Sequence, residues 1–176
     1  TAKELGAAYG NPLVLLMLGG FILAAALERS GAHRRIALYM VRAFGGTSPR
    51  RLVFGFMCAS AFLSMWISNT STTLMLLPVA LAALEKTDDM NLSGPLLLGI
   101  AYAASIGGIG TPIGTPPNMV FMGVYTEVTG GAVSFGQWML WAIPVVLIFL
   151  LQACGLPEVY PNPVGWRYLR LRPGAL

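Results

Sequence analysis

The sequence predicts an all-α integral membrane protein that contains a re-entrant helical hairpin and a broken transmembrane helix. Hydrophobic residues make up 56% of the 176 residues and charged residues only 10%, which is far too apolar for an ordinary soluble domain. The apolar residues lie in runs long enough to enter or cross a bilayer. Two of these runs are interrupted by polar or glycine- and proline-rich stretches, and irregular backbone at membrane depth is tolerated only inside protein or beside a water-filled cavity.

The first apolar run is Leu13–Leu27. With its weakly polar flanks it approaches the roughly 20 residues that a membrane-spanning helix needs. We therefore expect residues 1–31 to hold a transmembrane helix of a scaffold, with its N-terminal flank outside. The chain begins at Thr1 without a basic signal-peptide segment, and we interpret it as an excerpt of a longer protein.

Residues 32–48 are basic and amphipathic. Apolar residues recur at helical spacing on one side of this segment and arginines lie on the other, a pattern typical of a helix in the membrane interface. The apolar set is Ile36, Ala37, Met40, Val41 and Phe44, and the basic set is Arg34, Arg35 and Arg42. We interpret His33 as a solvated side chain of this basic flank.

The run Leu52–Leu84 is interrupted by the hexad SNTSTT. As one straight helix its 33 residues would extend about 50 Å, against a hydrocarbon core of about 30 Å. Cutting it at the hexad leaves two short arms, Leu52–Ile67 and Thr70–Leu84. The sequence therefore predicts a re-entrant hairpin over residues 49–87 with the hexad at its tip.

The distribution of basic residues favours the same topology. If the hairpin enters and leaves on the cytoplasmic side, nearly all arginines and lysines fall inside, as the positive-inside rule expects. A full crossing would instead place Arg50 and Lys86 on opposite sides. The basic residues on the inner side would be Arg29, Arg34, Arg35, Arg42, Arg50, Arg51, Lys86, Arg167, Arg170 and Arg172, with only Lys3 outside.

A second interruption, GGIGTPIGTPPN at residues 107–118, breaks the apolar run Leu92–Thr126, so we expect residues 92–128 to form a broken transmembrane helix. Glycine costs about 1 kcal/mol and proline about 3 kcal/mol in a helix interior, so this transmembrane helix must break here. Thr115 and Pro116 have the form of an N-cap and a first-turn proline that start a second half-helix, and we interpret Asn118 mainly as a cap of that half-helix. Residues 135–153 supply another transmembrane helix, with Trp138 at its outer interface. Residues 154–176 read as an irregular tail.

These interruptions predict a binding site without ionisable side chains. Helix ends at the hairpin tip, near Ser68 and Thr70, would offer carbonyls to a cation and N–H groups to an anion. No Asp, Glu, Lys, Arg or His lies within residues 52–84 or 92–126, so charge balance for a bound anion must come from bound cations. Coupled cation–anion transport is the economical hypothesis, with sodium as the cation because neutral oxygen ligands suit a hard ion.

The motif residues resemble those of a known family. Ser64, Ser68, Asn69 and Thr70, in the pattern S-x-x-x-S-N-T, followed about forty residues later by GIGTPIGTPPN, are similar to the amino-terminal repeat of the divalent anion/sodium symporters, the di- and tricarboxylate carriers. The resemblance extends over roughly residues 10–150. It implies one half of an inverted repeat and an interfacial arm at residues 32–44.

The resemblance also implies site residues. The cation site would contain Ser64, Ser68, Asn69 and the backbone of Gly114. A substrate carboxylate would be bound by Ser68, Asn69 and Thr70, with Thr115 and Pro116 close by.

Further implications concern the whole protein. The resemblance implies uptake of a succinate-like di- or tricarboxylate coupled to sodium entry, by a homodimer whose transport domains move like elevators. It implies a multi-pass protein of the inner cell membrane, with the hairpin opening and the basic loops in the cytoplasm.

Other classes are less consistent with the sequence. An oxyanion transporter or a sodium/proton antiporter of the same broad architecture is the alternative reading. An enzyme with a phosphate-binding loop is disfavoured because no Lys follows GIGTPIGTPPN and no strand precedes it. Nucleic-acid binding is disfavoured because the arginines do not alternate with aromatic residues. Cys58 and Cys154 lie inside apolar segments far apart in the sequence, so we expect buried thiols and no disulfide. The sequence has no cysteine or histidine spacing typical of a metal site.

Overall fold

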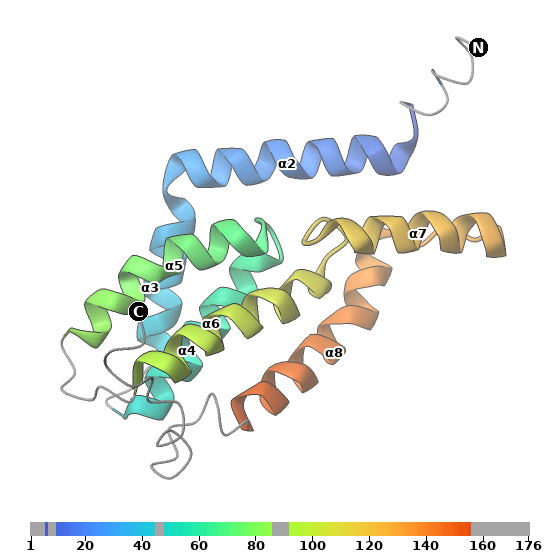
Figure 1. Ribbon diagram of the computed structural model, residues 1–176. Helices are drawn as coiled ribbons and strands as arrows, with labels where there is room; N and C mark the ends of the chain where they lie inside the picture. The colour runs from blue at the N-terminus through green and yellow to red at the C-terminus, as the bar shows by residue number, and fades with distance from the viewer. Residues whose placement is uncertain (1–5, 7–9, 45–47, 86–91, 156–176) are drawn as a thin grey trace, which may run out of the picture.

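The computed structural model describes residues 6, 10–44, 48–85 and 92–155, and the regular secondary structure among them is helical, with no strand (Figure 1). Three helical stretches are long and apolar enough to cross a membrane, namely Pro12–Ser30, Ser93–Gly110 and Phe135–Gly155. The prediction of an all-α membrane protein is confirmed at this level. The helices are α2 (Pro12–Ser30), α3 (Ala32–Phe44), α4 (Pro49–Ser64), α5 (Asn69–Leu84), α6 (Ser93–Gly107), the 3₁₀ turn η2 (Gly108–Gly110), α7 (Pro116–Thr129) and α8 (Phe135–Gly155).

Helix α2 begins and ends with conventional caps. Asn11 Oδ1 accepts the N–H of Leu13 at 2.9 Å, and Pro12 occupies the first helical position, where its missing N–H removes no hydrogen bond. Gly31, with φ 66°, ends the helix in the left-handed conformation that glycine adopts without penalty. This turn lets α3 leave sharply from the axis of α2 (Figure 1).

Helices α4 and α6 pack side by side and run in the same direction. Ser60 Oγ donates to Ile100 O at 2.8 Å, and one turn further along Ser64 Oγ lies 2.6 Å from Ala104 O. A Cβ atom on Gly107 would overlap the backbone of Ala61. Small residues and serine–carbonyl contacts are the features that hold membrane helices at close range.

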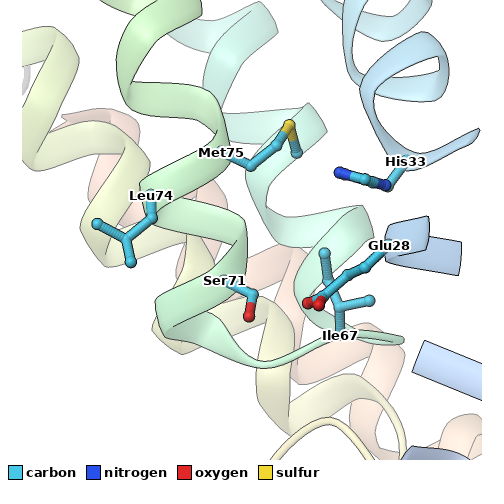
Figure 2. A pocket seen from close by; sticks show the side chains of 6 residues that line it. All are labelled: Glu28, His33, Ile67, Ser71, Leu74 and Met75. Atoms are coloured by element: carbon cyan, nitrogen blue, oxygen red, sulfur yellow. The ribbon is translucent and has the colours of Figure 1, made fainter. Parts of the chain in front are cut away.

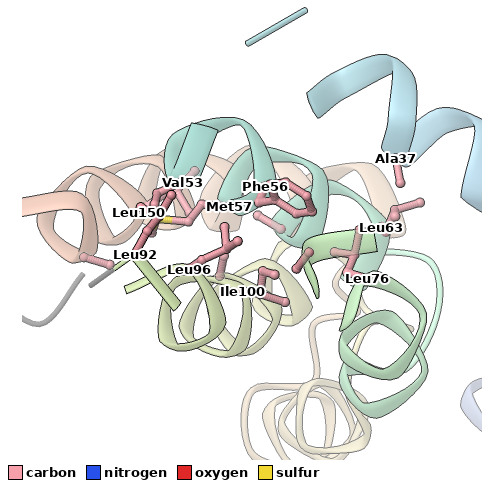
Figure 3. Close-up of a cluster of buried hydrophobic side chains, with 14 of the residues drawn as sticks. Ala37, Val53, Phe56, Met57, Leu63, Leu76, Leu92, Leu96, Ile100 and Leu150 are labelled. Carbon is pink, nitrogen blue, oxygen red and sulfur yellow. The ribbon is translucent and has the colours of Figure 1, made fainter. Parts of the chain in front are cut away.

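The apolar core lies among α4, α5, α6 and α8 (Figure 3). Phe56 and Met57 of α4 and Leu76 of α5 are at most 1% exposed, and α6 contributes Leu96 and Ile100. Helix α8 packs along α6 and contributes Leu150 to the same core cluster. Outside this core, α2 exposes most of its apolar side chains, as expected of a surface in contact with lipid.

Side-chain contacts at both ends of α8 fix its position against α7 and α4. Phe121 of α7 meets Trp138 of α8 edge to face, with ring centroids 5.8 Å apart. At the other end of α8, Cys154 Sγ lies 3.7 Å from Met57 Sδ. Cys58 and Cys154 are free, half-buried thiols. The tail expected after residue 153 lies, beyond Gly155, outside the described residues.

Candidate functional site

The tip of the hairpin is a tight turn between α4 and α5. The first arm ends at Ser64, three residues before the Ile67 that the sequence suggested, because the N–H groups of Trp66 and Ile67 both bond to Leu63 O in a closing turn. Ser68 is extended and caps α5, accepting the N–H of Ser71 at 3.1 Å. The second arm accordingly starts at Asn69, one residue before the predicted Thr70.

Three oxygen atoms crowd together just inside this tip. Ser64 Oγ lies 2.5 Å from Asn69 Oδ1 and 2.6 Å from Ala104 O. A hydroxyl has one proton to donate, so it bonds to only one of these acceptors and meets the other oxygen without a bridging hydrogen. Ser64 is fully buried. The cluster is thus rich in acceptors and short of donors, which is an environment favourable to a cation.

The loop of the broken helix is held by one asparagine. After α6 the chain forms η2, turns through residues 111–114 and starts α7 at Pro116. Asn118 Nδ2 donates to Gly108 O and to Thr111 O, both at 2.8 Å. The sequence suggested that Asn118 caps α7, but its amide instead ties the two sides of the loop together, because it points back from the first turn of α7 into the break.

The hairpin tip and the broken loop contact each other directly. Thr111 Oγ1 donates to Met65 O at 2.5 Å. A Cβ on Gly108 would meet Asn69 Oδ1, and a Cβ on Gly110 would meet the side chain of Met65. A Cβ at either position would therefore displace the side chain of Asn69 or Met65, which shows how closely the loop approaches the tip. The two interruptions that the sequence singled out are neighbours in space.

The residues predicted to bind the cation and the substrate differ in how far they are exposed to solvent. Ser64 and Gly114 are buried, Asn69 and Thr115 are half-buried, and Ser68, Thr70 and Pro116 are exposed. Ser64 and Asn69 touch each other, and Gly114 packs against Gly108, which contacts Asn69 in turn. The Ser68 hydroxyl is turned toward Ser71, with its oxygen 3.0 Å from Ser71 Oγ.

Sequence reasoning missed several contributors. Ala104 contributes only a backbone carbonyl, which leaves no trace in a side-chain pattern. Thr111 was part of the glycine–proline motif but was given no role. Trp138 was assigned to the outer interface, yet it is half-buried and its Nε1 donates to Ile109 O at 2.9 Å. The serine pair at positions 60 and 64, one turn apart on a helix, was the available signal for the contact with α6.

A hollow lies beside the hairpin, where α2 and α3 approach α5 (Figure 2). Its volume is about 350 Å³, and its lining residues are Glu28, His33, Ile67, Ser71, Leu74 and Met75. The Glu28 carboxylate reaches across toward Ser71 in Figure 2. His33 is half-buried, with Nδ1 2.8 Å from Leu27 O, and so is held against the end of α2 where the sequence suggested a solvated side chain.

Helix ends and neutral oxygens that meet inside an apolar bundle define a class of protein, the membrane transporters. The family model described as "Citrate transporter" (CitMHS) matches residues 1–173, and the chain belongs to this family. The resemblance to the divalent anion/sodium symporters is thereby confirmed, and the family is one of transporters and not of enzymes.

The similar curated proteins carry one name. The chain is 37% identical to the "Sodium-dependent dicarboxylate transporter SdcS" of Staphylococcus aureus strains NCTC 8325 / PS 47, COL and N315, over 186 aligned residues. The match covers 99% of this chain and 35% of each relative. The chain therefore spans about a third of the length of the relatives it matches.

Proposed function

We propose that these residues form the amino-terminal repeat of a secondary transporter that couples sodium entry to uptake of a di- or tricarboxylate such as succinate. The observation that carries the proposal is the acceptor-rich cluster of Ser64, Asn69 and Ala104 O at the point where the hairpin tip meets the broken helix. The sodium-dependent dicarboxylate transporters of S. aureus, at 37% identity, support the same reading.

The cation site would contain Ser64, Ser68, Asn69 and the backbone of Gly114. Ser64 and Asn69 already place two side-chain oxygens 2.5 Å apart, and the Ala104 carbonyl adds a third. A sodium ion at this point would bind these oxygens from one side and relieve the donor shortage. Its ligands are neutral, so the bound ion would leave a net positive charge at the tip.

The substrate carboxylate would lie next to that charge, bound by Ser68, Asn69 and Thr70 with Thr115 and Pro116 close by. Ser68 and Thr70 are exposed and can reach a ligand. Helices α5 and α7 both begin at this junction, and helix N-termini favour anions. Since residues 52–84 and 92–126 carry no cationic side chain, an anion would bind weakly until sodium is present, and this dependence is the coupling.

The larger arrangement is part of the same proposal. Helices α4 and α5 would re-enter the membrane from the cytoplasmic side as a hairpin, and the unit of hairpin, broken helix and α8 would move like an elevator against the scaffold helix α2. In the complete gene product, an inverted second repeat would supply the other cation site and the protein would be a homodimer in the inner cell membrane. Residues 1–31, 32–48, 49–87, 92–128 and 135–153 would be the functional segments.

Uptake of labelled succinate into proteoliposomes tests this function. The complete gene product that contains these residues would be assayed with an inward sodium gradient and with choline in place of sodium. We expect uptake only with sodium, and loss of that uptake in Asn69→Ala. Uptake that ignores sodium, or no uptake of succinate or citrate, would contradict the proposal and favour an oxyanion carrier or an antiporter.

Comparing alanine variants of Ser60 and Ser64 distinguishes binding of sodium by Ser64 from a role in helix packing alone. Ser60 and Ser64 both contact a carbonyl of α6, but only Ser64 also touches Asn69. Both Ser→Ala variants should lose about 1 kcal/mol of stability. Only Ser64→Ala should raise the sodium concentration for half-maximal uptake, by about tenfold or more, as expected for losing a ligand worth about 1.4 kcal/mol. Equal effects of both variants would mean that Ser64 acts only in packing.

A further inference from the structure

Helix α3 presents a basic face that nothing in the described part of the chain covers. Its other side packs on the bundle, with Ala37 fully buried and Ile36 and Val41 against the core. Arg34, Arg35 and Arg42 are exposed on the opposite face. No carboxylate among the described residues pairs with these three arginines. Within the described residues, these three guanidinium groups therefore face outward without a carboxylate partner.

The charge of the surrounding segment is of one sign. Residues 29–51 contain six arginines and no aspartate or glutamate. Arg29 lies in the last turn of α2 and Arg51 in the first turn of α4, so the arginines come from three consecutive helices. Arginines beside a helix that can cross the membrane are attracted to anionic lipid headgroups.

The position of α3 places this face at the level of the headgroups. The helix begins directly after α2, which is long and apolar enough to cross the membrane, and the left-handed Gly31 turns the chain away at that point. Tyr39 is 74% exposed on the basic face, and Phe44 is 50% exposed at the end of the helix. Exposed aromatic residues of this kind occupy the membrane–water interface.

We propose that the basic face of α3, formed by Arg34, Arg35, Tyr39 and Arg42, is a binding surface for anionic phospholipid headgroups. Guanidinium groups bind phosphate oxygens in a bidentate manner, and the arginine stems can lie along the acyl chains while their charged ends stay at the surface. An acidic protein surface would satisfy the charges equally well, but it would not account for aromatic side chains exposed beside the end of a membrane-spanning helix.

Native mass spectrometry of the complete gene product in detergent tests the proposal without any transport assay. Phosphatidylglycerol and phosphatidylcholine would be titrated separately, and bound lipid counted. We expect tighter binding of phosphatidylglycerol, weakened by added salt. The triple variant Arg34→Gln, Arg35→Gln, Arg42→Gln should lose this preference, by up to about fivefold in affinity for each arginine removed.

The matching triple variant to lysine retains the charge and is the control. It should keep most of the preference for phosphatidylglycerol and should show that the helix tolerates three substitutions. Equal affinity of the wild-type protein for both lipids would overturn the proposal. A glutamine variant that remains folded by circular dichroism and still prefers phosphatidylglycerol would also overturn it. The same holds if the glutamine variant binds lipid like the wild type but no longer co-purifies with an acidic protein that the wild type binds.

Discussion

The indole Nε1–H of Trp138, in the first turn of α8, donates to the carbonyl oxygen of Ile109 across 2.9 Å. Ile109 lies in the middle of η2, the short 3₁₀ turn that follows α6. The start of one membrane helix therefore holds the break in another. Together with Asn118 and Thr111, this contact fixes the loop that faces the hairpin tip.

Replacing Trp138 with Phe should weaken sodium binding without unfolding the protein. Phenylalanine keeps an aromatic ring against Phe121 but cannot donate to Ile109 O, so we expect about 1 kcal/mol of destabilisation. The sodium concentration for half-maximal uptake should rise a few-fold because the loop is less well held. Trp141→Phe is the control, since Trp141 is 51% exposed. Identical uptake curves for the two variants would argue against a positioning role of Trp138.

Asn118→Ala should destabilise the broken helix more strongly. It leaves Gly108 O and Thr111 O without their donor, and we expect a loss of about 2 kcal/mol. Thermal denaturation in detergent, followed by size-exclusion chromatography, measures this. Thr126→Ala in the same helix removes only a bond to Met122 O one turn back, and such bonds contribute little. Equal losses in the two variants would show that the loop does not depend on Asn118.

Thr72 and Thr111 should respond to substitution by valine in opposite ways. Both are fully buried, but Thr111 donates to Met65 O while Thr72 Oγ1 has no hydrogen-bond partner among the described residues. The isosteric change Thr111→Val should cost about 1–2 kcal/mol. Thr72→Val should leave the melting temperature unchanged or raise it, because it removes an unpaired buried hydroxyl. If Thr72→Val stays folded and stops uptake, the Thr72 hydroxyl has a functional partner and this expectation is wrong.

Gly107→Ala should disrupt the packing of α6 on α4. The added Cβ would overlap the backbone of Ala61, and backbone cannot move aside as a flexible side chain can, so we expect a loss of about 3 kcal/mol or no folded protein. Gly19→Ala in α2 meets no neighbouring atom and should be neutral or stabilising by up to about 1 kcal/mol. Yield and melting temperature in detergent compare the two variants. A Gly107→Ala protein as stable as wild type would contradict the parallel packing of these helices.

Much of the fold was predictable because it depends on properties that single residues carry. The membrane class follows from composition, and the two interruptions follow from residues that cannot continue an apolar helix, such as the glycines and prolines of residues 107–117. Helix ends were predicted to within a few residues. The end of α4 was placed three residues too late because the turn at residues 65–67 is closed by backbone hydrogen bonds, which have no signature in the side chains.

The sequence by itself determined that this protein belongs in a membrane and that its polar residues gather at two breaks, because hydrophobicity and helix-breaking are local properties. It also selected Ser64, Asn69 and Gly114 as candidate ligands through the resemblance of their motifs. Only the tertiary structure decided that the two breaks touch, through Thr111 and Met65 O, and that Ser64 faces both Asn69 and the carbonyl of Ala104. The contacts of Thr111 with Met65 O and of Ser64 with Ala104 O join residues 46 and 40 positions apart, and the backbone carbonyls that complete them are the same in every amino acid.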